Sequence, residues 1–123
     1  MAAPLHELLR AAGEPTRLRI LNLLRRRDFC VCDLQAVLGV PQSTVSRHLA
    51  ALRHANLVAD RRAGNRVVYS LASSDVLPIQ ALRRLLAECC PTEETLRADE
   101  ARFRRVFDQG ECCAPGEVQG ETS

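Results

Sequence analysis

The stretch that decides the fold is Gln42-Ser43-Thr44-Val45-Ser46-Arg47-His48-Leu49. Val45 and Leu49, continued by Leu52, recur at i, i+4 and i+7, which is the spacing of one face of an α-helix. Pro41 suits the first position of such a helix, so we expect the helix to begin at Pro41 or Gln42. The opposite face carries polar side chains of the kind that reach base edges and phosphates in a major groove, namely Gln42, Ser43, Ser46, Arg47 and His48.

The residues before this helix predict three more helices. Leu34, Val37 and Leu38 lie at helical spacing in residues 32–38, and Gly39 suits the left-handed residue that commonly closes a helix. Two further apolar runs, in residues 5–9 and 18–24, are separated by an interruption at residues 13–15. A short helix, a turn and a polar-faced helix together predict a helix-turn-helix.

Beyond Asn56 the apolar period changes from that of a helix to that of strands. Residues 57–59 run into a polar segment, and residues 67–71 alternate like a strand, so two strands joined at Gly64-Asn65 form a predicted hairpin. Arg61, Arg62 and Arg66 lie at or beside its tip. These arginines fit a wing that lies along a phosphate backbone.

Two more helical stretches complete the chain. One runs from Ser74 to a break at Cys89-Cys90-Pro91, and the other runs from Thr92 to about Phe107. The Gly- and Glu-rich end beyond them predicts no regular structure. We therefore expect a mainly α fold with a β-hairpin wing, a winged helix-turn-helix over residues 1–91, followed by a C-terminal helix and an acidic, cysteine-containing tail over residues 92–123.

Charge is distributed unevenly along the chain. Arginine supplies every basic charge, and residues 1–90 hold 13 arginines against seven acidic residues, whereas residues 91–123 hold four arginines against eight. A basic body fits a polyanionic partner, although a solvated surface gives a similar count. Neither a run of about 18 apolar residues nor an export signal is visible, so we expect a cytoplasmic protein with no membrane partner, whose six cysteines are reduced.

Four segments together resemble the ArsR/SmtB family of metal-responsive repressors over residues 5–88. They are residues 14–18 (Glu-Pro-Thr-Arg-Leu), residues 30–34 (Cys-Val-Cys-Asp-Leu), residues 42–49 and residues 64–69 (Gly-Asn-Arg-Val-Val-Tyr), in the order typical of the family. The resemblance implies a homodimer, joined through the first and fifth helices, that holds two recognition helices over an imperfect palindromic operator. Candidates for the dimer seam are Leu5, Leu8, Leu9, Leu82, Leu85 and Leu86, each of which could equally belong to the core of one subunit.

The expected DNA contacts follow from this arrangement. Eight residues are candidates, six from the recognition helix and two from the wing: Gln42, Ser43, Thr44, Ser46, Arg47, His48, Arg62 and Arg66. Thr44 could instead be a buried residue that stabilises the helix. No combination of nucleophile, base and orienting group is visible, so we expect no enzyme.

Cysteine spacing points to the inducer. The resemblance to the arsenic-responsive branch rests on Cys30-Val31-Cys32-Asp33, and it implies that trivalent arsenic, or antimony, binds thiolates and releases the repressor from DNA. Residues two apart on a regular helix project about 200° from each other, so two sulfurs could share one ion only if the helix start is bent or unwound.

The sequence alone does not identify the third ligand or the ion. Many arsenic-responsive relatives carry a third cysteine where this chain has Gln35, so a third thiolate would come from Cys89, Cys90, Cys112 or Cys113. Cadmium or lead would also suit thiolates, whereas the family's zinc site needs histidines that residues 74–90 lack. A thiol-redox sensor on the same fold is the other alternative.

Overall fold

The computed structural model describes residues 4–73 and 77–108. The helices are α1 (Leu5–Ala12), α2 (Pro15–Leu24), α3 (Val31–Leu38), α4 (Gln42–His54), α5 (Leu77–Cys89) and α6 (Glu94–Asp108), with a short 3₁₀ turn, η1 (Cys90–Thr92), between the last two. The strands are β1 (Phe29–Cys30), β2 (Val58–Ala63) and β3 (Arg66–Leu71). None of the described helices is both long and apolar enough to cross a membrane.

The helix-turn-helix consists of α3 and α4, as the sequence predicts. Gly39 ends α3 with a left-handed φ of 71°, and Pro41 stands immediately before α4 in extended conformation. Val45, Leu49 and Leu52 on α4 are fully buried, so the apolar face of the predicted recognition helix packs into the core.

The wing is an antiparallel hairpin of β2 and β3, turned at Gly64, which has a φ of 67°. Its two strands confirm the prediction, but the sheet has a third strand that the sequence analysis missed. β1 pairs antiparallel with β3 on the side away from β2, with Phe29 opposite Tyr69 and Cys30 opposite Val68. Cys30 therefore belongs to a strand and immediately precedes α3.

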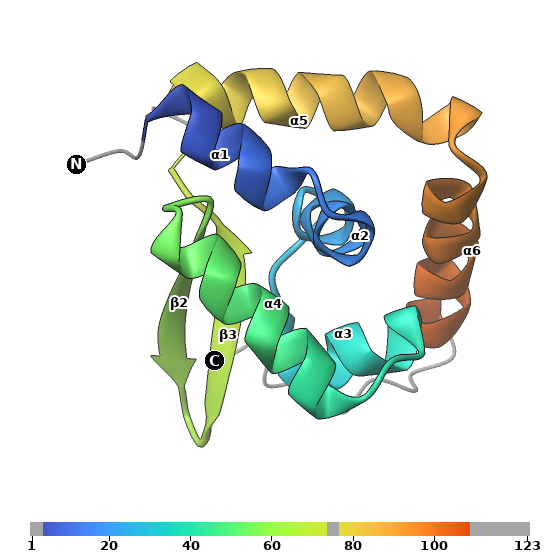
Figure 1. Ribbon diagram of the computed structural model, residues 1–123. Coiled ribbons are helices and arrows are strands. Elements are labelled where there is room, and N and C mark those ends of the chain that lie inside the picture. The colour runs from blue at the N-terminus through green and yellow to red at the C-terminus, as the bar shows by residue number, and fades with distance from the viewer. Residues whose placement is uncertain (1–3, 74–76, 109–123) are drawn as a thin grey trace.

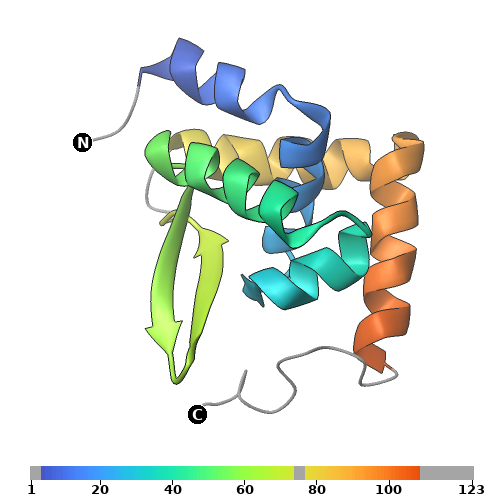
Figure 2. The same ribbon diagram turned by 60° about the horizontal axis from the view of Figure 1, so that its bottom comes forward.

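α5 and α6 frame the body on two sides. Figure 1 shows α5 across the top, beside α1, and α6 descending on the right towards α3, and Figure 2 shows the same arrangement from a tilted view. α6 packs on α2 and α3, and the rings of its Phe103 and Phe107 contact Phe29 of β1. α5 begins at Leu77 in the structure, whereas the apolar spacing predicts a start at Ser74, which lies outside the described residues. The boundary at residue 91 stays a prediction.

Candidate nucleic-acid interface and cysteine sites

The exposed face of α4 carries most of the expected DNA contacts. Gln42, Ser43, Ser46 and Arg47 are exposed, and Thr44 is half-buried. Arg47 forms no ion pair with any residue in the described part of the chain. Because these side chains share one face while the other face is buried, α4 can enter a groove without disturbing the core.

His48 lies on the same helix but in a different environment. Its side chain is buried, and its Nδ1 accepts a hydrogen bond from Arg17 Nε at 3.1 Å. Burial lowers the pKa of His48, with Glu14 at 3.8 Å opposing the shift and Arg17 and Arg47 supporting it. The structure therefore places His48 at the contact between α2 and α4, apart from the exposed residues that surround it in the sequence.

The wing presents charge along its strands. Arg62 is exposed and forms no ion pair with a described residue, whereas Arg66 is half-buried. Arg61 pairs with Asp28 at 2.8 Å, so this arginine is partly neutralised. Arg62 is thus the more exposed of the two wing arginines for which a DNA contact is expected.

The leucines expected at a dimer seam separate into two groups. Leu8 and Leu86 are buried in the core of the chain itself, and Leu82 is half-buried. Leu5, Leu9 and Leu85 are 63%, 61% and 54% exposed, and together they line a hollow of about 150 Å³ between α1 and α5. Large apolar side chains gathered at this level of exposure mark an association surface.

Cys30 and Cys32 lie two residues apart but in unlike surroundings. Cys30 is 5% exposed and extended, with φ −85° and ψ 167°, so it stands outside the helix that begins at Val31. Burial raises the pKa of the Cys30 thiol, and the neighbouring Asp33 adds smaller effects of both signs. Cys32 is exposed in the first turn of α3. Cys30 thus lies before the helix and Cys32 within its first turn. Cys32 is disulfide-bonded, which corrects the expectation that all six cysteines are reduced.

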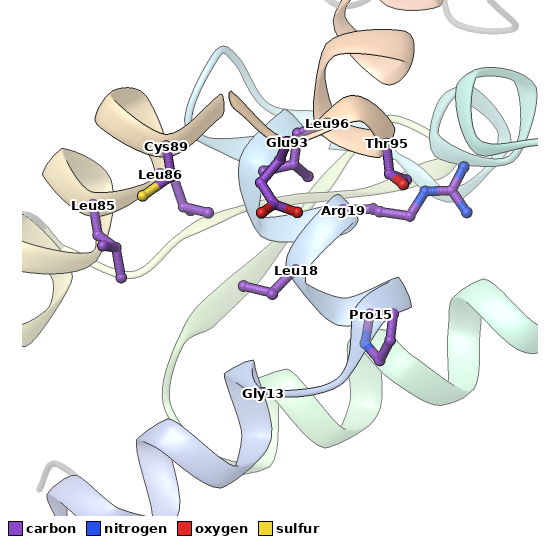
Figure 3. Close-up of a pocket in the computed structure, with 10 residues that line it drawn as sticks. All are labelled: Gly13, Pro15, Leu18, Arg19, Leu85, Leu86, Cys89, Glu93, Thr95 and Leu96. Carbon is purple, nitrogen blue, oxygen red and sulfur yellow. The ribbon is translucent and has the colours of Figure 1, made fainter. Parts of the chain in front are cut away.

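Cys89 and Cys90 also differ from each other in burial. Cys89 is half-buried at the end of α5 and lines a cavity of about 410 Å³, where Figure 3 shows it beside Leu85 and Leu86 with Arg19 across the space. Cys90 is buried, and its Sγ accepts a hydrogen bond from Asn22 Nδ2 at 3.8 Å.

Among residues 4–73 and 77–108, no three His, Cys, Asp or Glu side chains cluster closely enough to hold a metal ion. Cys112 and Cys113 lie outside the described residues. The described cysteines alone therefore do not fit a three-ligand metal site.

A buried charge cluster that the sequence analysis missed joins α6 to α2. Asp99 receives hydrogen bonds from Arg19 Nε and Nη2 at 2.9 and 3.0 Å, and Glu100 receives one from Arg26 Nη1 at 2.5 Å and one from Asn22 Nδ2 at 3.3 Å. Both carboxylates are buried. The sequence held one sign of this cluster, because Asp99 and Glu100 lie on the apolar face of the helix predicted over residues 92–107. Charges on such a face are costly unless they are paired.

The fold and the exposed face of α4 define a winged helix-turn-helix transcriptional regulator. Residues 14–60 match the family model described as bacterial regulatory protein, arsR family. The uncharacterized HTH-type transcriptional regulator Rv0081 of Mycobacterium tuberculosis is 38% identical over 98 residues, which are 75% of this chain and 86% of that protein. The chain belongs to the ArsR family of bacterial regulatory proteins.

The names of two other relatives describe one as a repressor and the other as a regulator of arsenic resistance. The transcriptional repressor SmtB homolog of Synechocystis is 43% identical over 76 residues, 62% of this chain and 58% of that protein. The arsenic resistance transcriptional regulator ArsR1 of Pseudomonas putida is 40% identical over 65 residues, 52% of this chain and 51% of that protein. The matches thus span little more than half the length of these two relatives.

Solved structures agree with the fold. HlyU from Vibrio cholerae, also solved in a form described as reduced, matches with a TM-score of 0.60 at 35% identity over 67% of this chain and 86% of HlyU. The Mycobacterium bovis fragment Mb0332 is described as a homodimeric winged helix-turn-helix DNA-binding domain. It matches with a TM-score of 0.59 at 32% identity over 68% of this chain and 78% of that fragment. The cadmium sensor CMTR of M. tuberculosis matches with a TM-score of 0.56 at 40% identity over 68% of this chain and 81% of CMTR. The mainly helical winged fold predicted from the sequence is confirmed.

Proposed function

We propose that this chain is a transcriptional repressor that binds a palindromic operator as a homodimer. The observation that carries the proposal is the two-sided α4, with Val45, Leu49 and Leu52 fully buried and Ser46 and Arg47 exposed beside an arginine-bearing wing. A single short helix contacts few bases, so two half-sites about one helical turn apart are needed for useful specificity. The exposed leucines of α1 and α5 supply a surface on which two copies can join.

The contact residues are tested with a duplex that the wild-type protein enriches from a random library, here called the selected duplex, and with a scrambled version of it. Replacing Arg47 by Ala weakens binding to the selected duplex by about 1–3 kcal/mol if Arg47 meets a base, and weakens binding to the scrambled duplex much less. The control is Arg97→Ala, an exposed arginine on α6 with the same change of charge. Equal losses on both duplexes contradict base contact and indicate a phosphate contact.

We further propose that trivalent arsenic or antimony, held by cysteine thiolates, releases the repressor. Arsenite suits three soft sulfur ligands. Cys30 and Cys32 would supply two thiolates. Because no three described side chains of one chain cluster, the third would come from Cys112 or Cys113, or across the dimer from Cys89 or Cys90. The extended backbone at Cys30 supports this assignment, because Cys30 stands outside the helix that carries Cys32. The name of the P. putida relative also supports it.

Two alternatives have support of their own. Cadmium or lead would use the same thiolates, in line with the description of CMTR as a cadmium sensor. A thiol-redox sensor needs no three-ligand cluster, and the described residues assemble none. One solved structure of HlyU is described as reduced, which is in line with this second alternative.

One experiment separates the three. Fluorescence anisotropy of the selected duplex with reduced protein is followed while arsenite, cadmium, lead or peroxide is added, for the wild type and for Cys30→Ser/Cys32→Ser. Release by arsenite that disappears in the double variant supports the arsenic assignment. Arsenite release that survives the double variant moves the site to the other cysteines. Release by cadmium or lead but not by arsenite favours the cadmium or lead alternative, and release by peroxide alone, reversed by a reductant, favours redox sensing.

A further inference from the structure

The C-terminal end of α3 is held by two arginines from outside the helix-turn-helix. Arg102 on α6 donates from Nη1 to the carbonyl oxygen of Val37 at 3.2 Å, and Arg19 on α2 donates from Nη2 to the carbonyl oxygen of Leu38 at 3.0 Å. The last four carbonyls of a helix have no partner within that helix. The two arginines therefore satisfy acceptors that α3 cannot satisfy itself.

α6 supplies or supports both of these contacts. Arg102 belongs to α6, and Asp99, one turn earlier on the same helix, binds the Arg19 guanidinium through both carboxylate oxygens. A two-point carboxylate–guanidinium pair fixes orientation as well as distance. Asp99 is 3% exposed, so the Arg19 pair is shielded from solvent on the carboxylate side.

The contacts converge on the turn that aims α4. A Cβ placed on Gly39 would lie 3.0 Å from Arg102 Nη1, so this guanidinium covers the turn directly. Only two residues separate Gly39 from the start of α4 at Gln42. α3 has eight residues, a length at which a helix depends on tertiary contacts for its stability.

We propose that Arg102 and Arg19 are positioning residues for DNA recognition, through which α6 fixes the direction in which α4 leaves the turn. The proposal rests on DNA binding by α4, as proposed above, and extends it to a helix outside residues 14–60, the part that matches the family model. Hydrogen bonds to base edges weaken steeply with misalignment, whereas attraction to phosphates tolerates it. Loosening the turn therefore lowers specificity more than it lowers general affinity for DNA.

The test compares Arg102→Ala with Arg104→Ala. Both arginines are exposed on α6 and both changes remove one positive charge, but the Arg104 side chain makes no hydrogen bond or ion pair with a described residue. Affinities for the selected and scrambled duplexes are measured by anisotropy, and amide hydrogen exchange is measured over residues 39–45 without DNA. Arg102→Lys, which keeps a charged donor, serves as the rescue variant.

For Arg102→Ala we expect the selected-to-scrambled affinity ratio to fall about 5- to 20-fold, amide exchange in the turn to accelerate, and Arg102→Lys to recover part of both. Arg104→Ala leaves the ratio and the exchange at wild-type values. The proposal is overturned if Arg102→Ala and Arg104→Ala give the same ratio and the same exchange. If the wild-type protein enriches no duplex, DNA binding itself fails, and the exchange comparison still decides whether Arg102 holds the turn.

Discussion

Replacing Glu100 by Gln tests how strongly α6 is bound to the body of the protein. The Glu100 side chain is 7% exposed and accepts a charged hydrogen bond from Arg26 at 2.5 Å, while Arg25 lies 3.5 Å away. Glutamine keeps an oxygen for the Asn22 amide but loses the charge that both arginines face. A charged hydrogen bond contributes about 1.5–3 kcal/mol, and because Arg26 is 38% exposed and regains hydration, we expect a loss of about 2 kcal/mol.

The assay is urea unfolding followed by far-ultraviolet circular dichroism at one fixed protein concentration, because dimerisation makes apparent stability depend on concentration. Thermal unfolding of the same samples should show a midpoint lower by about 8 °C for a domain of this size. Glu94→Gln, an exposed carboxylate in the first turn of α6, is the control, and it should cost less than about 1 kcal/mol through the helix dipole. If the two variants unfold at the same urea concentration, the Glu100 cluster does not hold α6, and the reasoning is refuted.

Three further outcomes are expected. Gly39→Ala should destabilise the protein by about 1–2 kcal/mol in urea unfolding, because alanine is strained at a φ of 71°, and an unchanged midpoint would contradict this. Burial lowers the pKa of His48 in the folded state below its unfolded value of about 6.5. Above about pH 6.5 the neutral side chain contributes its full stability to the folded state, and this stability is lost as the pH falls through the lower folded pKa. His48→Gln should accordingly show a smaller drop in urea midpoint between about pH 7.5 and about pH 5.5 than the wild type, whereas an identical drop would assign the pH dependence to other groups. Arg62→Ala should weaken binding to selected and scrambled duplexes alike and reduce the slope of log affinity against log salt by about 1, and a loss confined to the selected duplex would show that Arg62 reads bases.

The parts of the fold that the sequence predicted are those that local chemistry determines. α4 follows from the spacing of Val45, Leu49 and Leu52, and the end of α3 follows from Gly39, the residue that adopts a left-handed φ without strain. The hairpin follows from strand alternation on either side of Gly64. Each of these signals lies within a few residues of the element that it specifies.

The parts that the sequence did not predict depend on distant partners. β1 has two residues, and it exists because Phe29 and Cys30 pair with β3 about 40 residues later in the chain. The hydrogen bond that His48 accepts comes from Arg17, a residue of another helix, so the sequence of α4 gives no sign of this partner. The burial of His48 does have a local sign, because His48 lies three residues after Val45 and four before Leu52, on the face that packs into the core. The prediction that His48 belongs to the polar face of this helix is therefore wrong, and Thr44, for which burial was the alternative, is half-buried.

The two cysteine regions lie at places from which the same helix can be displaced. Cys30 is the residue on which α3 begins, and any change in the state of its thiol occurs inside the core at that end of the helix. Cys90 contacts Asn22, which also bonds Glu100 of α6, and α6 in turn holds the other end of α3 through Arg102. Ligation or oxidation of a buried thiol requires room that a close-packed interior lacks, so neighbouring elements must move. A path of contacts therefore connects each cysteine to α3 and, through the turn at Gly39, to α4.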